Sequence, residues 1–185
     1  MARIIVITGT PACGKTTISR KLASLITRSE LISANKLVLS LGLFRRDPGS
    51  QEAIADLGRL KQEINRRIAN SNASVIIIEG HLLCDIRIKG ATAIVVREHL
   101  ATLMRRMKRR RYGQSKIEGN IVSEAIDYCG VNAGRNYRNV YEIWSGGNAA
   151  RDILEIINGR KRAAKEIDLL AEMNGIAKRL NKAVL

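Results

Sequence analysis

Near the start of the chain, residues 3–17 read RIIVITGTPACGKTT. The β-branched apolar run at residues 3–8 is typical of a strand buried on both faces. Apolar residues at helical spacing then predict a helix over residues 15–26. Between these elements, GTPACGKT matches the pattern G-x-x-x-x-G-K-[ST]. The motif therefore stands between a strand and a helix, which is the context that a P-loop requires.

A P-loop predicts a cradle for phosphate groups. Its glycines let several backbone N–H groups point inward at phosphate oxygens, and the following helix adds the positive end of its dipole. Lys15 is expected to reach the β- and γ-phosphates, and the Thr16 hydroxyl is expected to hold Mg²⁺. We therefore expect the chain to bind a nucleoside triphosphate and to transfer or hydrolyse its terminal phosphate. The expected binding residues are Gly9, Ala12, Cys13, Gly14, Lys15, Thr16 and Thr17.

Strand and helix patterns alternate along the rest of the chain. Further strands are predicted at residues 30–33, 74–79, 91–96 and 140–144. Helices are predicted from residue 34 through 41 and at residues 52–69, 99–110 and 115–128, with a loop at 42–50. Residues 148–185 predict helices with breaks near Gly159 and Gly175. The alternation indicates one α/β domain with a parallel sheet covered on both faces.

The composition fits a compact domain. Of 185 residues, 45% are apolar and 3% aromatic, so we expect a core of Ile, Leu, Val and Ala. No apolar run approaches the ~20 residues that span a bilayer, and the N-terminus lacks a signal-peptide cleavage site. Cys13, Cys84 and Cys129 have neither metal nor disulfide spacing. We therefore expect a cytoplasmic protein with no membrane partner.

The charge balance is strongly basic. Thirty-two Lys and Arg residues stand against 17 Asp and Glu residues, which gives a net charge of +15. Such a surface attracts polyanions, of which nucleic acid is the leading candidate for a soluble protein. A solvated basic surface with no such partner is the alternative, and composition alone leaves both open.

A second candidate site follows the strand predicted at residues 74–79. Glu79 closes this strand, and His81 comes two residues later. P-loop enzymes place a carboxylate at such a strand end to hold Mg²⁺ or to orient water, so Glu79 is a candidate metal ligand. His81 would orient water or the transferring phosphoryl group, and Asp85 is a weaker candidate in the same loop. A strand-end salt bridge and a surface histidine are the alternatives.

A cluster of cations lies on the helix predicted at residues 99–110. A positioned arginine stabilises the negative charge that phosphoryl transfer spreads over the equatorial oxygens. A helix distributes its side chains around its axis, so we expect one or two of these cations to enter the site. The others are solvated or contact an RNA backbone. The cluster comprises Arg105, Arg106, Lys108, Arg109, Arg110 and Arg111, followed by Tyr112 and Lys116.

Several motifs in this order resemble one known family over roughly residues 3–157. They are ITGTPACGKTT at residues 7–17, VIIIEGH at 75–81, Arg97 after the strand AIVV, and VYEI before Gly146 and Gly147. The spacing of Arg106, Arg110, Tyr112, Lys116, Asn120 and Glu124 matches as well. The pattern resembles the adenylate kinase isoenzyme 6 family, small archaeal or nuclear nucleoside-monophosphate-kinase-like ATPases of small-subunit ribosome maturation.

The resemblance implies a P-loop NTPase core at residues 1–158, with a parallel five-stranded sheet flanked by helices. It implies a substrate-side segment at about residues 32–55 and a very short lid at about 109–119. ATP and Mg²⁺ are the implied ligands, with Thr16 and Glu79 on the metal and Arg106 and Arg110 on ATP. Lys15, Glu79, His81 and Arg110 would be catalytic. The implied activity combines adenylate kinase and ATPase reactions, with a small-subunit ribosomal protein and rRNA as partners.

Three features depart from the family pattern. Lys36 stands where an acidic residue is common and Leu39 where a basic one is common, which leaves the monophosphate site open. Ala12 and Cys13 replace a common Gly-Val pair. Residues 159–185 form a basic helical extension that either packs on the core or contacts RNA. The hypotheses are thus an adenylate kinase, a ribosome-assembly ATPase with little AMP kinase activity, and a kinase for another small acceptor.

Overall fold

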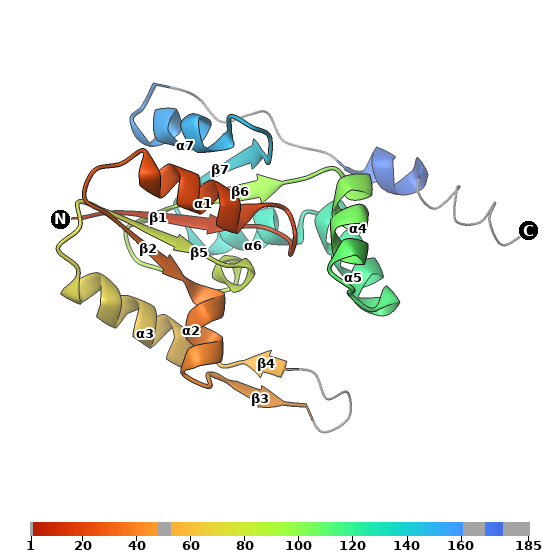
Figure 1. Ribbon diagram of the computed structural model, residues 1–185, viewed down its shortest axis with the longest axis horizontal. Helices are drawn as coiled ribbons and strands as arrows, with labels where there is room; N and C mark the ends of the chain where they lie inside the picture. Colours follow the sequence, from red (N-terminus) through yellow and green to blue (C-terminus); the bar gives the residue numbers. More distant parts are fainter. Residues whose placement is uncertain (1, 48–52, 161–168, 176–185) are drawn as a thin grey trace, which may run out of the picture.

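A parallel sheet of five strands forms the centre of the protein (Figure 1). The computed structural model describes residues 2–47, 53–160 and 169–175. The strand order is β2-β5-β1-β6-β7, and every neighbouring pair in this sheet is parallel. The predicted five-stranded α/β fold is therefore confirmed. The strands are β1 (Arg3–Thr8), β2 (Ser29–Ser33), β5 (Val75–Glu79), β6 (Ala91–Arg97) and β7 (Asn139–Trp144).

Helices cover both faces of the sheet because its central strand is apolar on both sides. In β1, Ile5 and Ile7 enter one buried cluster, while Val6 enters the other. The first cluster lies under α1 (Lys15–Ser24) and α7 (Ala149–Ile157), at the top of Figure 1. The second lies under α3 (Leu57–Asn70) and α6 (Tyr128–Asn136). Both faces of the sheet thus contribute to a packed core.

Two groups of elements extend beyond the carboxyl edge of the sheet. One is α2 (Ala34–Ser40) with a small antiparallel hairpin of β3 (Phe44–Arg46) and β4 (Ala53–Ala55). The other is the pair α4 (Leu100–Arg109) and α5 (Gln114–Ala125), joined by a short turn. Figure 1 shows these groups around the end of the sheet where β1 terminates. The strand order reverses at β1, which is where doubly wound sheets bind ligands.

Gly9 makes the exit from β1 possible. Its φ of +135° is one that glycine adopts readily, and a Cβ there would lie 2.4 Å from the carbonyl oxygen of Val96. The chain therefore turns out of β1 in close contact with β6, and a larger residue would separate the two strands.

The hairpin corrects two predictions. Residues 42–50 were expected to form a loop and residues 52–69 a helix, yet β3 and β4 pair, and α3 begins at Leu57. The Asp56 side chain accepts a hydrogen bond from the backbone N–H of Arg59, which caps α3 and fixes its start. The hairpin arises from pairing between separate segments, which helical periodicity within one segment does not reveal. Residues 48–52 lie outside the described chain.

A helix was also missed between α5 and β7. The predicted helix over residues 115–128 ends early, because Asp127 adopts a left-handed conformation with φ 54°. Its side chain accepts a hydrogen bond from Gly130 N–H and so caps α6, which spans residues expected to be irregular. Cys129 and Ala133 are buried one helical turn apart. Glycines at positions 130 and 134 had obscured this helical face.

Part of the C-terminal extension contacts the core. Leu169 is buried among the residues packed around α1, α4 and α7, and residues 170–175 are helical. The carboxylate of Glu172 accepts a hydrogen bond from Leu100 N–H at the start of α4. Residues 161–168 and 176–185 of the predicted extension lie outside the described chain. Among the described residues, no helix has both the length and the apolar character needed to cross a membrane.

Candidate functional site

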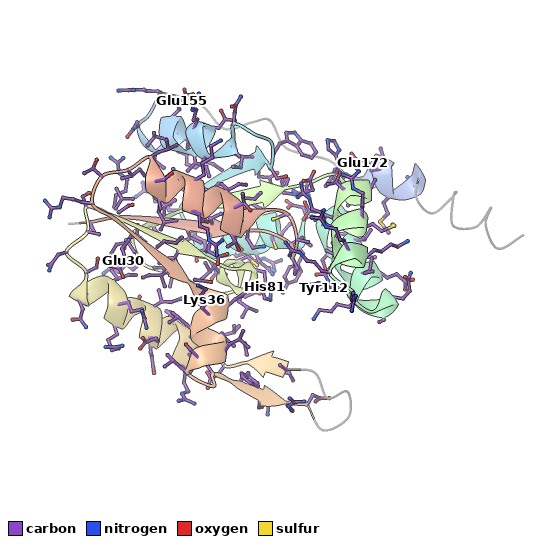
Figure 2. The ribbon with its side chains drawn as sticks, viewed as in Figure 1. Glu30, Lys36, His81, Tyr112, Glu155 and Glu172 are labelled. Carbon is purple, nitrogen blue, oxygen red and sulfur yellow. The ribbon has the colours of Figure 1, made fainter. Side chains whose placement is uncertain are left out.

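A pocket lies over the P-loop at the carboxyl edge of the sheet. The loop after β1, the start of α2, the end of β5 and the α4–α5 turn all contribute to its walls. In Figure 2, the labelled side chains of His81 and Tyr112 lie in the region between α2 and the α4–α5 pair. The pocket thus joins chain segments far apart in sequence. Its lining residues are Pro11, Ala12, Gly14, Lys15, Thr16, Thr17, Asn35, Glu79, His81, Arg110, Tyr112 and Lys116.

Lys15 is held tightly within the loop. Its side chain is buried, and its Nζ donates to the carbonyl oxygens of Gly9 at 2.8 Å and Thr10 at 2.9 Å. Ala12 takes a left-handed conformation at φ 70°, and Gly14 has φ 108°. These turns bend the loop around the amine. The result is a fixed positive charge beside the N-terminus of α1, an arrangement suited to a bound phosphate group.

Glu79 lies directly beside the P-loop helix. Its carboxylate accepts hydrogen bonds from the hydroxyls of Thr16 at 3.1 Å and Ser33 at 2.5 Å, and only 3% of the residue is exposed. In the described chain, no salt bridge reaches this carboxylate, in contrast to the salt bridge predicted as an alternative. A buried carboxylate bonded to hydroxyl oxygens is a donor set that fits Mg²⁺. Thr16 and Glu79 are therefore the residues that would hold the metal.

His81 opens a short 3-10 helix, His81–Cys84, directly after β5. Burial, together with the nearby positive charges of Lys15 and Lys116, lowers the pKa of His81 to about 4, against the opposing effect of Asp85. The imidazole is therefore neutral at pH 7, so one of its ring nitrogens can accept a hydrogen bond. A neutral imidazole facing the pocket can orient a water molecule or an acceptor group.

Gly80, just before His81, lets the chain pass close to the start of α2. A Cβ added to Gly80 would lie 2.7 Å from the Cβ of Ala34, so both positions need small residues. Asp85, the weaker candidate in this loop, accepts hydrogen bonds from Tyr128 and Asn132. These bonds fasten the loop to α6.

Three cations of the predicted cluster line pockets next to the P-loop. Arg110 lines the pocket just described and also a second pocket on the other side of Gly14 and Thr17. Arg106 and Arg109 line this second pocket, together with Lys21 of α1 and residues 145–147. We predicted that one or two of these cations would enter the site, and Arg110 is the member of Arg105–Arg111 that lines the pocket over the P-loop. Arg106 donates from Nη1 to the Ala12 carbonyl at 3.2 Å.

Two predicted binding residues of the P-loop, Gly9 and Cys13, do not line either pocket. Cys13 is fully buried, and its Sγ is 3.7 Å from Lys15 Nζ. Burial raises the pKa of this thiol, so its side chain is neutral at pH 7. Gly9 contributes its carbonyl to Lys15 and its small size to the contact with β6. The other predicted P-loop binding residues, Ala12, Gly14, Lys15, Thr16 and Thr17, line the pockets.

Sequence reasoning missed several residues at the site. Ser33 bonds Glu79, while Asn35 lines the pocket beside it. Ser33 ends β2 and Asn35 follows it, so their place at the carboxyl end of this strand could have marked them once the sheet order was known. Tyr112 and Lys116 had been noted only for their spacing. The ammonium of Lys116 lies 5.2 Å from the centre of the Tyr112 ring, so the pair forms one wall of the pocket.

A buried charge network connects the P-loop to α5, β6 and β7. Arg97 donates to Glu124 at 3.0 Å and to Asp127 at 2.5 Å, and it also pairs with Glu142. The second carboxylate oxygen of Glu124 accepts a hydrogen bond from the hydroxyl of Thr10 in the P-loop. One carboxylate thus links α5, β6 and the phosphate-binding loop.

Comparison with known proteins agrees with this geometry. A family model described as "AAA domain" matches residues 5–127, which include the P-loop, Glu79, His81, Arg106 and Arg110. The chain belongs to this AAA-domain family. Similar proteins carry the name "Putative adenylate kinase" in three archaea. One from Thermococcus onnurineus is 27% identical, with 96% of this chain and 97% of that protein aligned. The relative from Thermococcus kodakarensis is 30% identical over 88% of both chains, and that from Methanosarcina barkeri is 31% identical over 80% of both.

Solved structures share the fold of this AAA-domain chain at much lower identity. Shikimate kinase from Acinetobacter baumannii has a TM-score of 0.60 and 14% identity, over 87% of this chain and 96% of that one. The protein TT1252 from Thermus thermophilus also has a TM-score of 0.60 and 14% identity, over 88% and 99%. The chain therefore has a kinase-like P-loop fold.

Proposed function

We propose that this chain is a Mg²⁺-dependent adenylate kinase that transfers the γ-phosphate of ATP to AMP. It hydrolyses ATP slowly when water takes the place of AMP. The observation that carries the proposal is the P-loop pocket, which brings Lys15, Thr16 and Glu79 together with His81 and Arg110. The archaeal relatives named as adenylate kinases support AMP as the acceptor.

Each of these side chains has a role suited to phosphoryl transfer. Lys15 and Arg110 stabilise the negative charge on the transferring group, which is the main catalytic requirement of such a reaction. Thr16 and Glu79 would hold Mg²⁺, which would neutralise phosphate charge when bound. Neutral His81 accepts a hydrogen bond and orients the incoming acceptor or water. An acceptor oxygen forms a bond to the γ-phosphorus as the bond to the bridging oxygen of ADP breaks, so no covalent enzyme intermediate is needed.

The test is ATP turnover by the purified chain, with Mg²⁺, in the presence and absence of each nucleoside monophosphate. We expect ADP formation to rise most strongly with AMP. Lys15→Ala should lower kcat by at least about 100-fold, because it removes a charge that stabilises the transition state. Lys61→Ala is the matched control, since Lys61 is an exposed lysine on α3 away from the pocket. Its turnover should stay at the wild-type level.

Two results would contradict the proposal. Activity that survives Lys15→Ala would place the reaction outside the P-loop or in a contaminant. Stimulation by a different monophosphate, with none by AMP, would keep the kinase and replace the acceptor.

A second candidate function is a ribosome-assembly ATPase that binds RNA or a ribosomal protein and turns over little AMP. Its support is the net charge of +15, the exposed Arg45 and Arg46 on the hairpin, and the resemblance to the isoenzyme 6 family. Lys36 and Leu39 are exposed on α2, where the match to that family is poorest. Weak stimulation by AMP together with salt-sensitive binding of small-subunit rRNA would favour this function over a housekeeping kinase.

A further inference from the structure

Cys84 and Cys129 lie in contact, although 45 residues separate them along the chain. Cys84 ends the 3-10 helix that begins at His81, and Cys129 lies in the first turn of α6. Their sulfur atoms are 3.7 Å apart, and the two residues are only 1% and 7% exposed. Both thiols are free. The spacing of the cysteines in the sequence did not indicate such a pair, so the contact is a product of the fold.

Hydrogen bonds between the two segments hold this contact in place. The side chain of Asn136 on α6 donates to the carbonyl oxygen of Cys84 at 2.8 Å. The hydroxyl of Tyr137, directly after α6, donates to the carbonyl oxygen of Leu83 at 2.7 Å. These bonds use amide, hydroxyl and carbonyl groups, so they do not depend on the chemical state of either thiol. The backbone on both sides of the sulfur pair is therefore anchored.

The spacing of the two sulfur atoms suits a disulfide bond. An S–S bond is about 2.05 Å long, so side chains whose sulfur atoms start 3.7 Å apart need to move by roughly 0.8 Å each. Small rotations of the two side chains supply this movement while the anchored backbone stays in place. The third cysteine, Cys13, is fully buried, and its sulfur lies against the amine of Lys15.

The burial of the pair determines which oxidant can reach it. Hydrogen bonding with Cys84 and burial raise the pKa of the Cys129 thiol, which slows its oxidation because the thiolate is the reactive form. An oxidant at so enclosed a place has to be small and uncharged, and a hydroperoxide such as hydrogen peroxide meets both conditions. Cys129 is the more exposed of the two residues, so it is the one that the oxidant reaches first.

We infer that Cys84 and Cys129 form an oxidation site at which a hydroperoxide produces a reversible disulfide. In the first step, the Cys129 sulfur takes an oxygen atom from hydrogen peroxide, becomes a sulfenic acid and releases one water molecule. In the second step, the Cys84 sulfur attacks the Cys129 sulfur, and a second water molecule leaves. The two thiols have then lost two electrons and two protons, and the peroxide has become two water molecules.

The disulfide fastens the segment that carries His81 to α6. It closes a loop of 45 residues that contains β6, α4 and α5, which removes conformations from the unfolded chain and so stabilises the fold. It also removes the Cys84 hydrogen that is donated to the His81 carbonyl oxygen at 3.2 Å. Oxidation therefore produces a second, more stable form of the chain with an altered contact beside the pocket.

The test treats the purified, folded chain with hydrogen peroxide and then alkylates its free thiols with iodoacetamide in denaturant. Mass spectrometry should find one alkylated cysteine per chain in place of three. A protease digest should contain two peptides linked through Cys84 and Cys129. The melting temperature should rise by about 5–10 °C on oxidation and return to its first value after dithiothreitol.

Two variants separate the proposed pair from the third cysteine. Cys13→Ala is the matched control, because it removes a buried cysteine and leaves the pair intact. Its linked peptide and its rise in melting temperature should match those of wild type. Cys129→Ala removes one partner, so peroxide should give no linked peptide and no rise in melting temperature. The digest of the wild-type chain determines the pairing even where a variant folds poorly.

Several results would overturn this oxidation site. They are three alkylated cysteines after peroxide treatment, a disulfide that includes Cys13, sulfinic acid on Cys129 with no linked peptide, and a linked peptide without a rise in melting temperature. None of these measurements uses ATP, so each result would leave the proposed kinase reaction standing. A chain that forms the disulfide but turns over no ATP would overturn the proposed function and support the oxidation site.

Discussion

The protein controls the charge of single side chains at its site by burial and by their neighbours. Lys15 is enclosed by two carbonyl oxygens, and Glu79 is enclosed by two hydroxyls. His81 lies near two lysines and is kept neutral. One pocket thus contains a cation, an anion and a neutral base, each suited to a separate role in the proposed phosphoryl transfer.

The lowered pKa of His81 predicts how stability depends on pH in metal-free buffer. The pKa is about 4 in the folded chain and about 6.5 in the unfolded chain, so the unfolded state takes up the proton first as pH falls. Stability from this residue is complete above about pH 6.5 and is lost between about pH 6.5 and 4. We expect the loss to be about 1–3 kcal/mol, from urea unfolding at several pH values.

His81→Gln is the variant that isolates this effect. A side chain that does not titrate should flatten the stability profile over the same pH window relative to wild type. Proton NMR of the His81 ring in metal-free protein provides a direct readout. A midpoint near pH 6.5 would show that the imidazole is not shielded from solvent and would refute the prediction.

Among the elements, the connection of α5 to the sheet depends on Arg97. Its guanidinium is only 1% exposed, and its carboxylate partners come from α5, the α5–α6 junction and β7. Through Glu124 the same network reaches Thr10 of the P-loop. Helix α5 and the P-loop therefore share one buried support.

Arg97→Met should destabilise the fold strongly. It keeps an apolar side chain of similar length but leaves buried carboxylates without their cation, which costs about 3–5 kcal/mol. Urea unfolding measures this loss as a lower midpoint. The control is Arg66→Met, which removes a largely exposed ion pair on α3 and should change stability by less than about 1 kcal/mol. Equal effects of the two substitutions would contradict the role given to the Arg97 network.

At the scale of the whole molecule, residues 169–175 connect the C-terminal part of the chain to the start of α4. Figure 2 shows Glu172 beside the start of α4. Its carboxylate accepts from Leu100 N–H at 3.0 Å and pairs with His99, whose ring stacks on Trp144 at 4.3 Å. An acidic group at a helix N-terminus also interacts favourably with the helix dipole.

Glu172→Gln should loosen the first turn of α4. Removing the charge weakens this cap by about 0.5–1 kcal/mol, so exchange of the Leu100 amide hydrogen should become several-fold faster. Hydrogen exchange read by NMR measures this amide directly. Glu155→Gln, on the exposed side of α7, is the control and should leave Leu100 unchanged. Unaltered exchange at Leu100 in Glu172→Gln would mean that the contact does not support the first turn of α4.

Local patterns in the sequence were sufficient for the five strands of the parallel sheet, the P-loop and most helices. The β-branched runs could bury both faces only in a covered parallel sheet, and the glycine loop followed β1 directly. Glu79 and His81 were predictable because they stand where a buried strand ends. Such features depend on residues next to each other in the chain, so reading the sequence in order revealed them.

Tertiary structure decided the features that depend on contacts between distant segments. It paired β3 with β4, capped α6 with Asp127, and brought Ser33 to Glu79. It also selected which cations of α4 face the pockets, because Glu98 and the Ala12 carbonyl hold Arg106 in place. The sequence by itself thus determined a phosphate-binding α/β fold. The tertiary structure decided which side chains line its site, because hydrogen bonds and ion pairs across the sheet edge form only when the strands lie side by side.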